Sequence, residues 1–304
     1  MKTKQKPQVK YEVNLVNLIE RFGSEDKCRN YLEQLRWPEG PECPRCKGRA
    51  VCRVTERHKY DCNACRYQFS VTANTILHDS HLPLWKWFLA VYMMTESKKG
   101  ISALQLKRTL EVAYKTAWYL CHRIRDAMSQ ATAADGKLDG VIEADETLVG
   151  GKAKGKGRGY IRNKAHVAGV VQRGGKVRLK VLTDRTRESL HKFLDDHVDK
   201  AELDKLYTDE WEAYKGFTVD HETVCHALEE WARGDVHINS AETVWSLLKR
   251  AIIGAYHRIS HKHLDRYLDE LEWRFGNRDN AFLFRDTIAC LLKAEKLEYK
   301  TLTA

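Results

Sequence analysis

Residues 140–159 read GVIEADETLVGGKAKGKGRG and give the first indication of how the chain folds. An apolar run typical of a strand leads into three carboxylates, Glu143, Asp145 and Glu146. The chain then becomes rich in glycine and carries four cations: Lys152, Lys154, Lys156 and Arg158. Acids beside cations can pair in solvent, or the acids can hold a metal ion while the cationic loop holds a polyanion. The stretch therefore predicts either a solvated charge cluster or a metal site beside a binding loop.

Strand and helix patterns continue on the C-terminal side of this stretch. Three strand patterns come first, then a helical pattern, a short strand that runs into an acid, and a late helical pattern. They occupy residues 137–146, 166–172, 177–183, 186–199, 206–217 and 239–253. Strands and helices in this order predict a mixed α/β sheet.

Three acids fall at the ends of these elements: Asp145 after the first strand, Asp209 after the fourth, and Glu242 early in the late helix. Carboxylates at the ends of neighbouring strands can converge on two ions about 3.5–4 Å apart. Lys249 lies seven residues after Glu242 and shares its helix face, so it can meet a phosphate there. The three acids and Lys249 are therefore the candidate catalytic residues.

Each acid also has a plain structural explanation. Glu143 and Glu146 are expected to be solvated or paired in the loop, and Asp209 can be a turn former. Glu242 fits a capping box in which Asn239 is the N-cap residue.

Composition and charge limit the classes of protein to which the chain can belong. The 304 residues are 43% hydrophobic and 31% charged, which suits a globular chain of two or three units. No apolar run of about 18 residues exists and the N-terminus has no secretory h-region, so a cytoplasmic, nucleoid-associated protein without a membrane span is expected. Residues 1–136 hold 23 Lys+Arg against 14 Asp+Glu, whereas residues 137–304 hold 29 against 28. A basic N-terminal part predicts a polyanionic partner.

Four of the nine cysteines form two CxxC pairs, CPRC and CNAC, separated by fifteen residues. These are Cys43, Cys46, Cys62 and Cys65. Two such pairs at this distance predict a zinc ribbon in which four thiolates close on one Zn²⁺. Two reduced dithiols without metal are the alternative, and Cys52 or His58 could replace a ligand at poorer spacing. Seven Lys and Arg residues surround the pairs, which favours nucleic acid as the partner.

A helical region follows the ribbon. Helices are expected at 82–97, 101–110 and 113–128, and the last two are separated by a short break. This pair predicts a helix-turn-helix whose second helix presents Lys115 and Thr116 to DNA, although any helical hairpin would look similar. Further along that helix, Arg123 and Arg125 are expected to touch phosphates. Residues 129–140 are expected to form a linker.

The chain resembles bacterial insertion-sequence transposases of the zinc-ribbon kind, whose catalytic part is called ISXO2-like. The resemblance is carried by CPRC…CNAC, EADETLVGGK, YTDEWEAYKGF and HINSAETVWSLLKRAIIGAYHRISHKHLDRYLDELEWRFGNRD, and spans roughly residues 20 to 280. It implies an RNase H-like fold with a DDE metal triad, in which Asp145, Asp209 and Glu242 match the acids and Lys249 the following base. Some relatives use Asn as the third ligand, so Asn239 stays an alternative to Glu242.

The resemblance also implies a function and a domain order. A transposase cuts element ends by metal-dependent hydrolysis and joins the 3′-hydroxyls to target DNA by transesterification, with two Mg²⁺ (or Mn²⁺) ions and one structural Zn²⁺. DNA and a second copy of the chain, as a homodimer or higher multimer, are the expected partners. The expected DNA contacts are Lys115, Thr116, Lys152, Lys154, Lys156, Arg158, Lys249 and Arg250. The expected parts are 1–80 with the ribbon at about 40–70, 81–130, 137–280, and a helical tail 281–304 packed on the core.

Two other functions fit the same sequence. One is a non-catalytic zinc-ribbon DNA-binding regulator derived from a transposase. The other is an RNase H-like DNA nuclease or resolvase. Terminal inverted repeats bounded by a short target duplication in the flanks of the gene would favour a transposase, and their absence would favour both alternatives.

Overall fold

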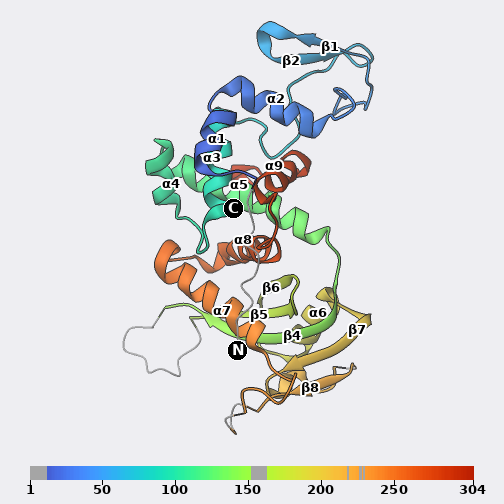
Figure 1. Cartoon of the computed structure of the whole chain (residues 1–304), viewed down its shortest axis with the longest axis vertical. Helices are drawn as coiled ribbons and strands as arrows, with labels where there is room; N and C mark the ends of the chain where they lie inside the picture. The colour runs from blue at the N-terminus through green and yellow to red at the C-terminus, as the bar shows by residue number, and fades with distance from the viewer. Residues whose placement is uncertain (1–11, 152–162, 218, 226–227, 229) are drawn as a thin grey trace, which may run out of the picture. The chain divides into compact units, whose positions relative to one another are not determined.

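The structure is a computed structural model that describes residues 12–151, 163–217, 219–225, 228 and 230–304. It divides into two compact units: unit 1 comprises Met1–Ala131 with Asp279–Ala304, and unit 2 comprises Thr132–Arg278 (Figure 1). The predicted loop contacts Lys152, Lys154, Lys156 and Arg158 lie outside the described residues. Among the residues that are described, no helix has both the length and the apolarity to cross a bilayer.

Unit 1 contains a small three-stranded sheet and a set of helices. The helices are α1 (Leu15–Phe22), α2 (Glu25–Arg36), α3 (Leu84–Glu96), α4 (Ala103–Leu110), α5 (Tyr114–Ala133, which ends in unit 2), α9 (Leu283–Lys293) and α10 (Tyr299–Thr303). The antiparallel sheet is β1 (Val51–Val54), β2 (Lys59–Cys62) and β3 (Gln68–Phe69), in that order. Helices α3, α4 and α5 match the three helical patterns of the sequence, whereas α1 and α2 were not predicted.

Side-chain caps and one left-handed residue set the limits of these helices. Ser24 caps α2 and Ser102 caps α4, each by accepting a bond from a backbone N–H of the first turn. Glu111 takes the left-handed conformation (φ 51°) that ends α4 before α5 begins. Helix α5 continues to Ala133 and the next strand starts at Leu138, so the linker expected at 129–140 is only four residues long.

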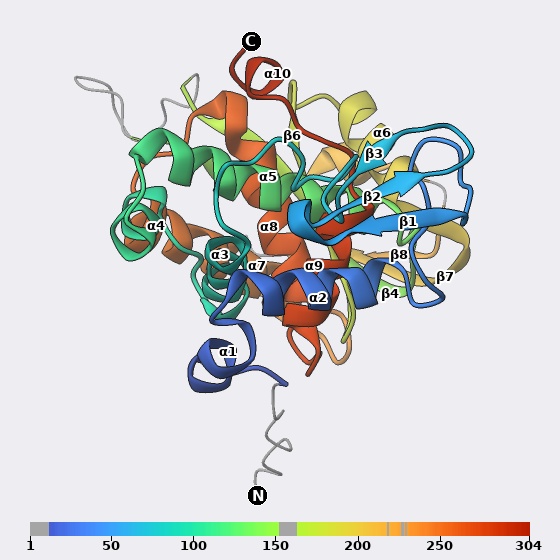
Figure 2. The same cartoon turned by 90° about the horizontal axis from the view of Figure 1, so that it is seen from above.

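The interior of unit 1 joins its first and last helices. Phe22 of α1 lies 5.0 Å from Phe88 of α3 and 5.7 Å from Phe284 of α9, between ring centroids. Helices α2, α3 and α9 pack together in both views (Figures 1 and 2). The predicted tail helix is therefore two helices, and α9 is part of the core of unit 1.

Two arginines of α5 are buried, and the prediction that they touch phosphates is wrong. Arg123 is 4% exposed and Arg125 is 1% exposed. The guanidinium of Arg123 lies over the rings of Trp87 and Tyr119, at 4.9 and 5.3 Å, and donates to the His78 carbonyl. An arginine that is stacked on two aromatic rings and bonded to a backbone carbonyl serves packing here.

Unit 2 is built on a five-stranded mixed sheet with the order β6-β5-β4-β7-β8. The strands are β4 (Leu138–Val149), β5 (Ala165–Gln172), β6 (Val177–Leu182), β7 (Val198–Thr208) and β8 (His221–Thr223). Strands β4, β5 and β6 are antiparallel neighbours, and β7 and β8 join in parallel to β4 and β7 respectively. This order and these directions are those of an RNase H-like sheet, so the predicted fold class is confirmed.

Helices cover both faces of this sheet. They are α6 (Arg187–His197), α7 (Asn239–Ala251) and α8 (Leu264–Gly276), with a short turn of 3₁₀ helix at Glu212–Tyr214. One core joins α7 and α8 to β5 and β6, and the other joins α6 to β4, β5 and β7 (Figure 1). Because side chains alternate along a strand, Glu143 and Asp145 of β4 face α7, and Ile142 and Ala144 face α6.

Candidate active site and zinc ribbon

The register of two parallel strands brings the predicted aspartates together. Strand β4 pairs with β7 so that Glu143 lies opposite Tyr207. Asp145 lies two residues after Glu143, and Asp209 lies two residues after Tyr207. The two aspartates therefore lie at the same level along the paired strands. One carboxylate oxygen from each of Asp145, Glu146 and Asp209 lies within 4.8 Å of the other two. Three carboxylates at this spacing form an oxygen-only donor set, which suits Mg²⁺ or Mn²⁺.

Asp145 is held on both sides by hydrogen bonds. The indole Nε1 of Trp245, on α7, donates to its Oδ2 at 2.9 Å, and the backbone N–H of Glu146 donates to its Oδ1 at 2.8 Å. Burial raises the pKa of Asp145 to about 6, and the negative charges of Asp209 and Glu242 add to the rise. A divalent cation among these acids would relieve that repulsion, so the donor set fits such an ion.

Glu146 belongs to the cluster, contrary to the prediction that it is solvated or paired in the loop. Its Oε2 accepts a bond of 2.8 Å from the hydroxyl of Tyr214, a side chain that is 1% exposed. Burial raises the pKa of Glu146 to about 7, and Asp209 and Asp145 raise it further. The sequence contained no signal for this contact, because Tyr214 is 68 residues away.

Glu242 lies in the first turn of α7 and is exposed. It stands outside the group of three oxygens within 4.8 Å, and its charge still acts on Asp145. The predicted capping box is wrong: the N-cap residue of α7 is Ile238, and no side chain of the cap bonds to the helix. Lys249 and Arg250 are exposed in the last turn of the same helix.

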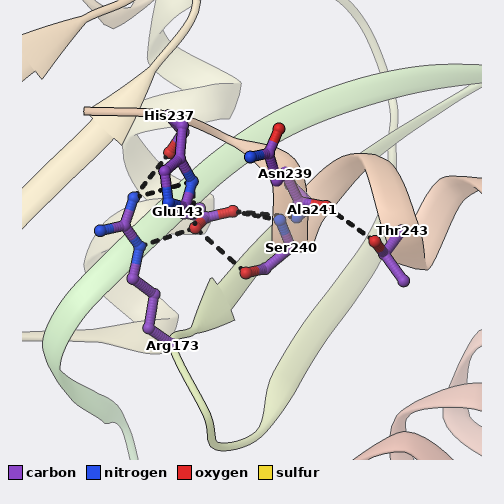
Figure 3. A network of polar contacts seen from close by, with 7 residues as sticks. All are labelled: Glu143, Arg173, His237, Asn239, Ser240, Ala241 and Thr243. Carbon is purple, nitrogen blue, oxygen red and sulfur yellow. Dashed lines mark hydrogen bonds and ion pairs between the residues drawn. The ribbon is translucent and has the colours of Figure 1, made fainter. Parts of the chain in front are cut away.

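Glu143 takes over the role of the missing cap. The prediction that it is solvated or paired in the loop is wrong, because its side chain is 0% exposed. Its Oε2 accepts bonds from the backbone N–H groups of Ser240 and Ala241 at 2.7 and 3.1 Å (Figure 3). A carboxylate at this place satisfies the free N–H groups and the positive end of the α7 dipole.

The four predicted zinc ligands come together in the ribbon of unit 1. Cys43, Cys46, Cys62 and Cys65 each place a sulfur within 4.8 Å of the others. The sulfur of Cys43 lies 3.7 Å from that of Cys65, and the sulfur of Cys46 lies 3.5 Å from that of Cys62. Tetrahedral Zn²⁺ with bonds of about 2.3 Å requires sulfurs about 3.8 Å apart, so the set fits zinc.

Backbone hydrogen bonds repeat in the two CxxC turns. The N–H of Lys47 donates to the Cys43 carbonyl, and the N–H of Arg66 donates to the Cys62 carbonyl. The backbone N–H of Cys65 is the main cause that lowers the pKa of the Cys62 thiol to about 7. A thiol that ionises more readily is a better zinc ligand. Cys52 is outside the cluster and bonds to Asn63 instead.

The start of α5 carries the predicted DNA contacts Lys115 and Thr116, which are both exposed. The ammonium of Lys115 lies 4.3 Å from the ring centroid of Tyr299, which belongs to α10. The hydroxyl of Tyr119 donates to the Leu297 carbonyl beside it. The C-terminal segment therefore packs against the end of the helix at which DNA contact is predicted.

Comparison with known proteins places the chain in a family. Residues 137–276 match the model of the ISXO2-like transposase domain, and residues 23–68 match the transposase zinc-ribbon domain. An uncharacterized protein in transposable element ISH50 of Halobacterium salinarum is 30% identical over 278 residues, covering 84% of this chain and 92% of the relative. The chain belongs to the insertion-sequence transposases that combine a zinc ribbon with an ISXO2-like DDE domain, and the resemblance seen in its motifs is confirmed.

Solved structures give a weaker likeness. The Mos1 strand transfer complex is 12% identical with a TM-score of 0.30, over 68% of this chain and 75% of that chain. A pre-cleavage Mos1 transpososome is 11% identical with a TM-score of 0.26, over 69% and 79%. The fold class rests on the strand order of unit 2.

Proposed function

We propose that this transposase cuts the ends of its insertion sequence and joins their 3′-hydroxyl groups to target DNA. The proposal rests on the position of Asp145 and Asp209, which lie side by side at the ends of two paired parallel strands. The charge of Glu242 acts on the same site, since it raises the pKa of Asp145. A site of this kind suits phosphodiester chemistry, which needs acids that hold metal and no protein nucleophile.

Each of these residues has a role in the proposal. Asp145, Asp209 and Glu242 would hold two Mg²⁺ ions, which when bound activate water or a 3′-hydroxyl and stabilise the leaving oxygen. Trp245 orients Asp145, because its indole N–H occupies one of the two carboxylate oxygens. Lys249, two turns further along α7, contacts a DNA phosphate.

DNA binding is assigned to both units. The element end would be held by the ribbon, with one structural Zn²⁺, and by the start of α5, with Lys115 and Thr116. The DNA strand at the acids would be held by Arg250 and by the loop cations Lys152, Lys154, Lys156 and Arg158. Most of these contacts are to phosphates, so they give affinity without sequence choice. Two ends must be joined, so the working form is a homodimer or larger multimer on cytoplasmic DNA.

The test is cleavage of a supercoiled plasmid that bears the native flanks of the gene, with Mg²⁺ or with EDTA. Wild-type protein should nick at the element boundary only with Mg²⁺, and Asp209→Asn should lose the nicking while retaining DNA binding. Wild-type protein that binds these ends and never cuts them would contradict the proposal in favour of a DNA-binding regulator. Cutting at branched DNA, with no preference for the ends, would contradict it in favour of a nuclease or resolvase.

A further inference from the structure

A buried ionic network lies beside the three acids and touches the element that carries each of them. Its centre is Glu143, two residues before Asp145 on β4 and therefore on the same face of the sheet. Figure 3 shows that Glu143 lies between Arg173, His237 and the first turn of α7. Burying a carboxylate completely is costly unless every oxygen is bonded, and here both oxygens are.

The first connection of the network fixes the helix of Glu242. Glu143 binds the backbone N–H groups of Ser240 and Ala241, and its Oε1 accepts the Ser240 hydroxyl at 3.1 Å. Glu242 follows Ala241 directly. The position of Glu242 along the sheet is therefore set by a side chain that belongs to the same strand as Asp145.

The second connection reaches the strand of Asp209. Arg173 donates from Nε to Glu143 Oε1 at 2.7 Å, and its guanidinium lies 4.5 Å from the ring centroid of Tyr207. Tyr207 is two residues before Asp209 on β7, in the same relation as Glu143 to Asp145. The Nη2 of Arg173 also donates to the His237 carbonyl at 2.9 Å, in the segment that leads into α7.

We infer that Glu143 and Arg173 are positioning residues that hold β4, β7 and α7 in the arrangement in which Asp145, Asp209 and Glu242 share metal. The inference rests on the proposed function, since it concerns the ligands of that site. Neither residue touches the metal or the DNA in this role. Each acts through the elements on which the ligands stand, as partners of metal ligands commonly do.

The variant Glu143→Gln tests this with little change in volume. Its amide nitrogen would face N–H donors, so the first turn of α7 should lose its anchor. Mn²⁺ affinity should fall about 10-fold and the cleavage rate about 10- to 100-fold, while the Kd for element-end DNA stays within about twofold. Arg173→Lys keeps the positive charge but lacks the several N–H donors of the guanidinium. Its Mn²⁺ affinity and cleavage rate should therefore fall by less than those of Glu143→Gln. Glu202→Gln, an exposed acid on β7, is the matched control.

Protein cleavage by bound Fe²⁺ gives a readout independent of activity. Fe²⁺ with ascorbate and peroxide cuts the backbone beside its site, and wild-type protein should be cut near residues 145, 209 and 242. Glu143→Gln should lose the cut near 242 and Arg173→Lys should weaken it, while both retain the other two cuts. Both variants should melt above the assay temperature. Variants that keep all three cuts and normal Mn²⁺ affinity would overturn the inference. No Fe²⁺-dependent cut in wild-type protein would overturn the proposed function itself, and the inference with it.

Discussion

At the scale of single residues, the choice of the third metal ligand can be decided by substitution. Glu242 is exposed and its charge acts on Asp145, whereas Glu146 has one oxygen bonded to the buried Tyr214 hydroxyl. Asn239 is exposed at the first position of α7, and its side chain points away from Glu143 (Figure 3).

We therefore expect Glu242→Gln to lower the cleavage rate by about 100-fold or more, and Glu146→Gln to lower it by about 10-fold. Asn239→Ala should cleave within about threefold of wild type, because its backbone carbonyl, which accepts the Thr243 hydroxyl, is retained. Single-turnover cleavage with Mn²⁺ measures all three. A larger loss in Asn239→Ala than in Glu242→Gln would assign the ligand to Asn239.

A second prediction at this scale concerns Glu272, which lies in α8 and accepts a bond from the backbone N–H of Leu179. Burial raises the pKa of Glu272 to about 8, and the charge of Asp269 adds to the rise. In the unfolded chain a Glu has a pKa of about 4.3, so between these two pKa values folded protein holds a proton that unfolded protein has released. This residue therefore lowers stability as the pH rises from about 5 to 8.

The variant Glu272→Gln keeps the acceptor oxygen and has no proton to lose. Its free energy of unfolding should increase relative to wild type between pH 5 and pH 8, by on the order of 1–4 kcal/mol. Urea unfolding at several pH values measures the difference. Parallel pH profiles for the two proteins would show that Glu272 has no such effect.

At the scale of elements, the contact between β5 and α7 depends on Gly169. Gly169 lies opposite Asp145 in the sheet. A Cβ there would lie 2.7 Å from the Trp245 ring and 2.9 Å from Leu179 Cδ2, both closer than real contacts. The absence of a side chain is therefore what lets Trp245 reach Asp145.

We expect Gly169→Ala to lower the free energy of unfolding by about 1–3 kcal/mol through overpacking, and to displace Trp245. The loss of the indole bond should also slow cleavage. Gly151→Ala is the control, because a Cβ there meets no atom of the described residues within 4 Å. Thermal unfolding and cleavage measured on both variants test the expectation, which an unchanged melting temperature in Gly169→Ala would refute.

The zinc ribbon allows a second prediction at the scale of elements. Substituting Cys62→Ser removes one of four sulfurs, so bound zinc should fall from one ion to none, and the three short strands should lose their order. Affinity for DNA should fall about 10-fold or more. Cys52→Ser, outside the cluster, should change neither. Metal analysis and binding titrations measure both effects, and full zinc in Cys62→Ser would exclude it as a ligand.

Sequence patterns predicted the elements whose period is strong and missed contacts that depend on the fold. The strands at 165–172 and 177–182 and helix α7 were predicted because their apolar residues recur at a clear spacing. The first half of β7 was missed, because it is polar and exposed at most positions. The cluster of four cysteines and the closeness of Asp145 to Asp209 were predicted, since ligand spacing and strand ends are local features.

The roles of Glu143 and Glu146 could not be predicted from the sequence. Both were expected in solvent or paired in the loop because they are acids next to a cationic loop. Their actual partners, Ser240 and Tyr214, are 97 and 68 residues away. Only the sheet and the helices packed on it bring such residues together, and no periodic pattern records the pairing.

At the scale of the whole molecule, charge is divided between the two units. Unit 1 holds 27 Lys+Arg against 17 Asp+Glu, and unit 2 holds 25 of each. The whole net charge of +10 therefore belongs to unit 1, which contains the ribbon and α5. Non-specific affinity for DNA comes largely from cations that replace counterions on phosphates.

Unit 2 has its own two cores and is one continuous segment, so a fragment of residues 132–278 should fold alone. The fragment should unfold cooperatively and bind Mn²⁺ as tightly as the full chain. Its affinity for element-end DNA should be lower by about 100-fold or more, and its salt dependence should be shallower than that of the full chain. Calorimetry and binding titrations across a range of salt concentrations measure these quantities. A fragment that binds DNA as tightly as the full chain would place the main DNA contacts in unit 2, on the loop and on α7, rather than in the basic unit.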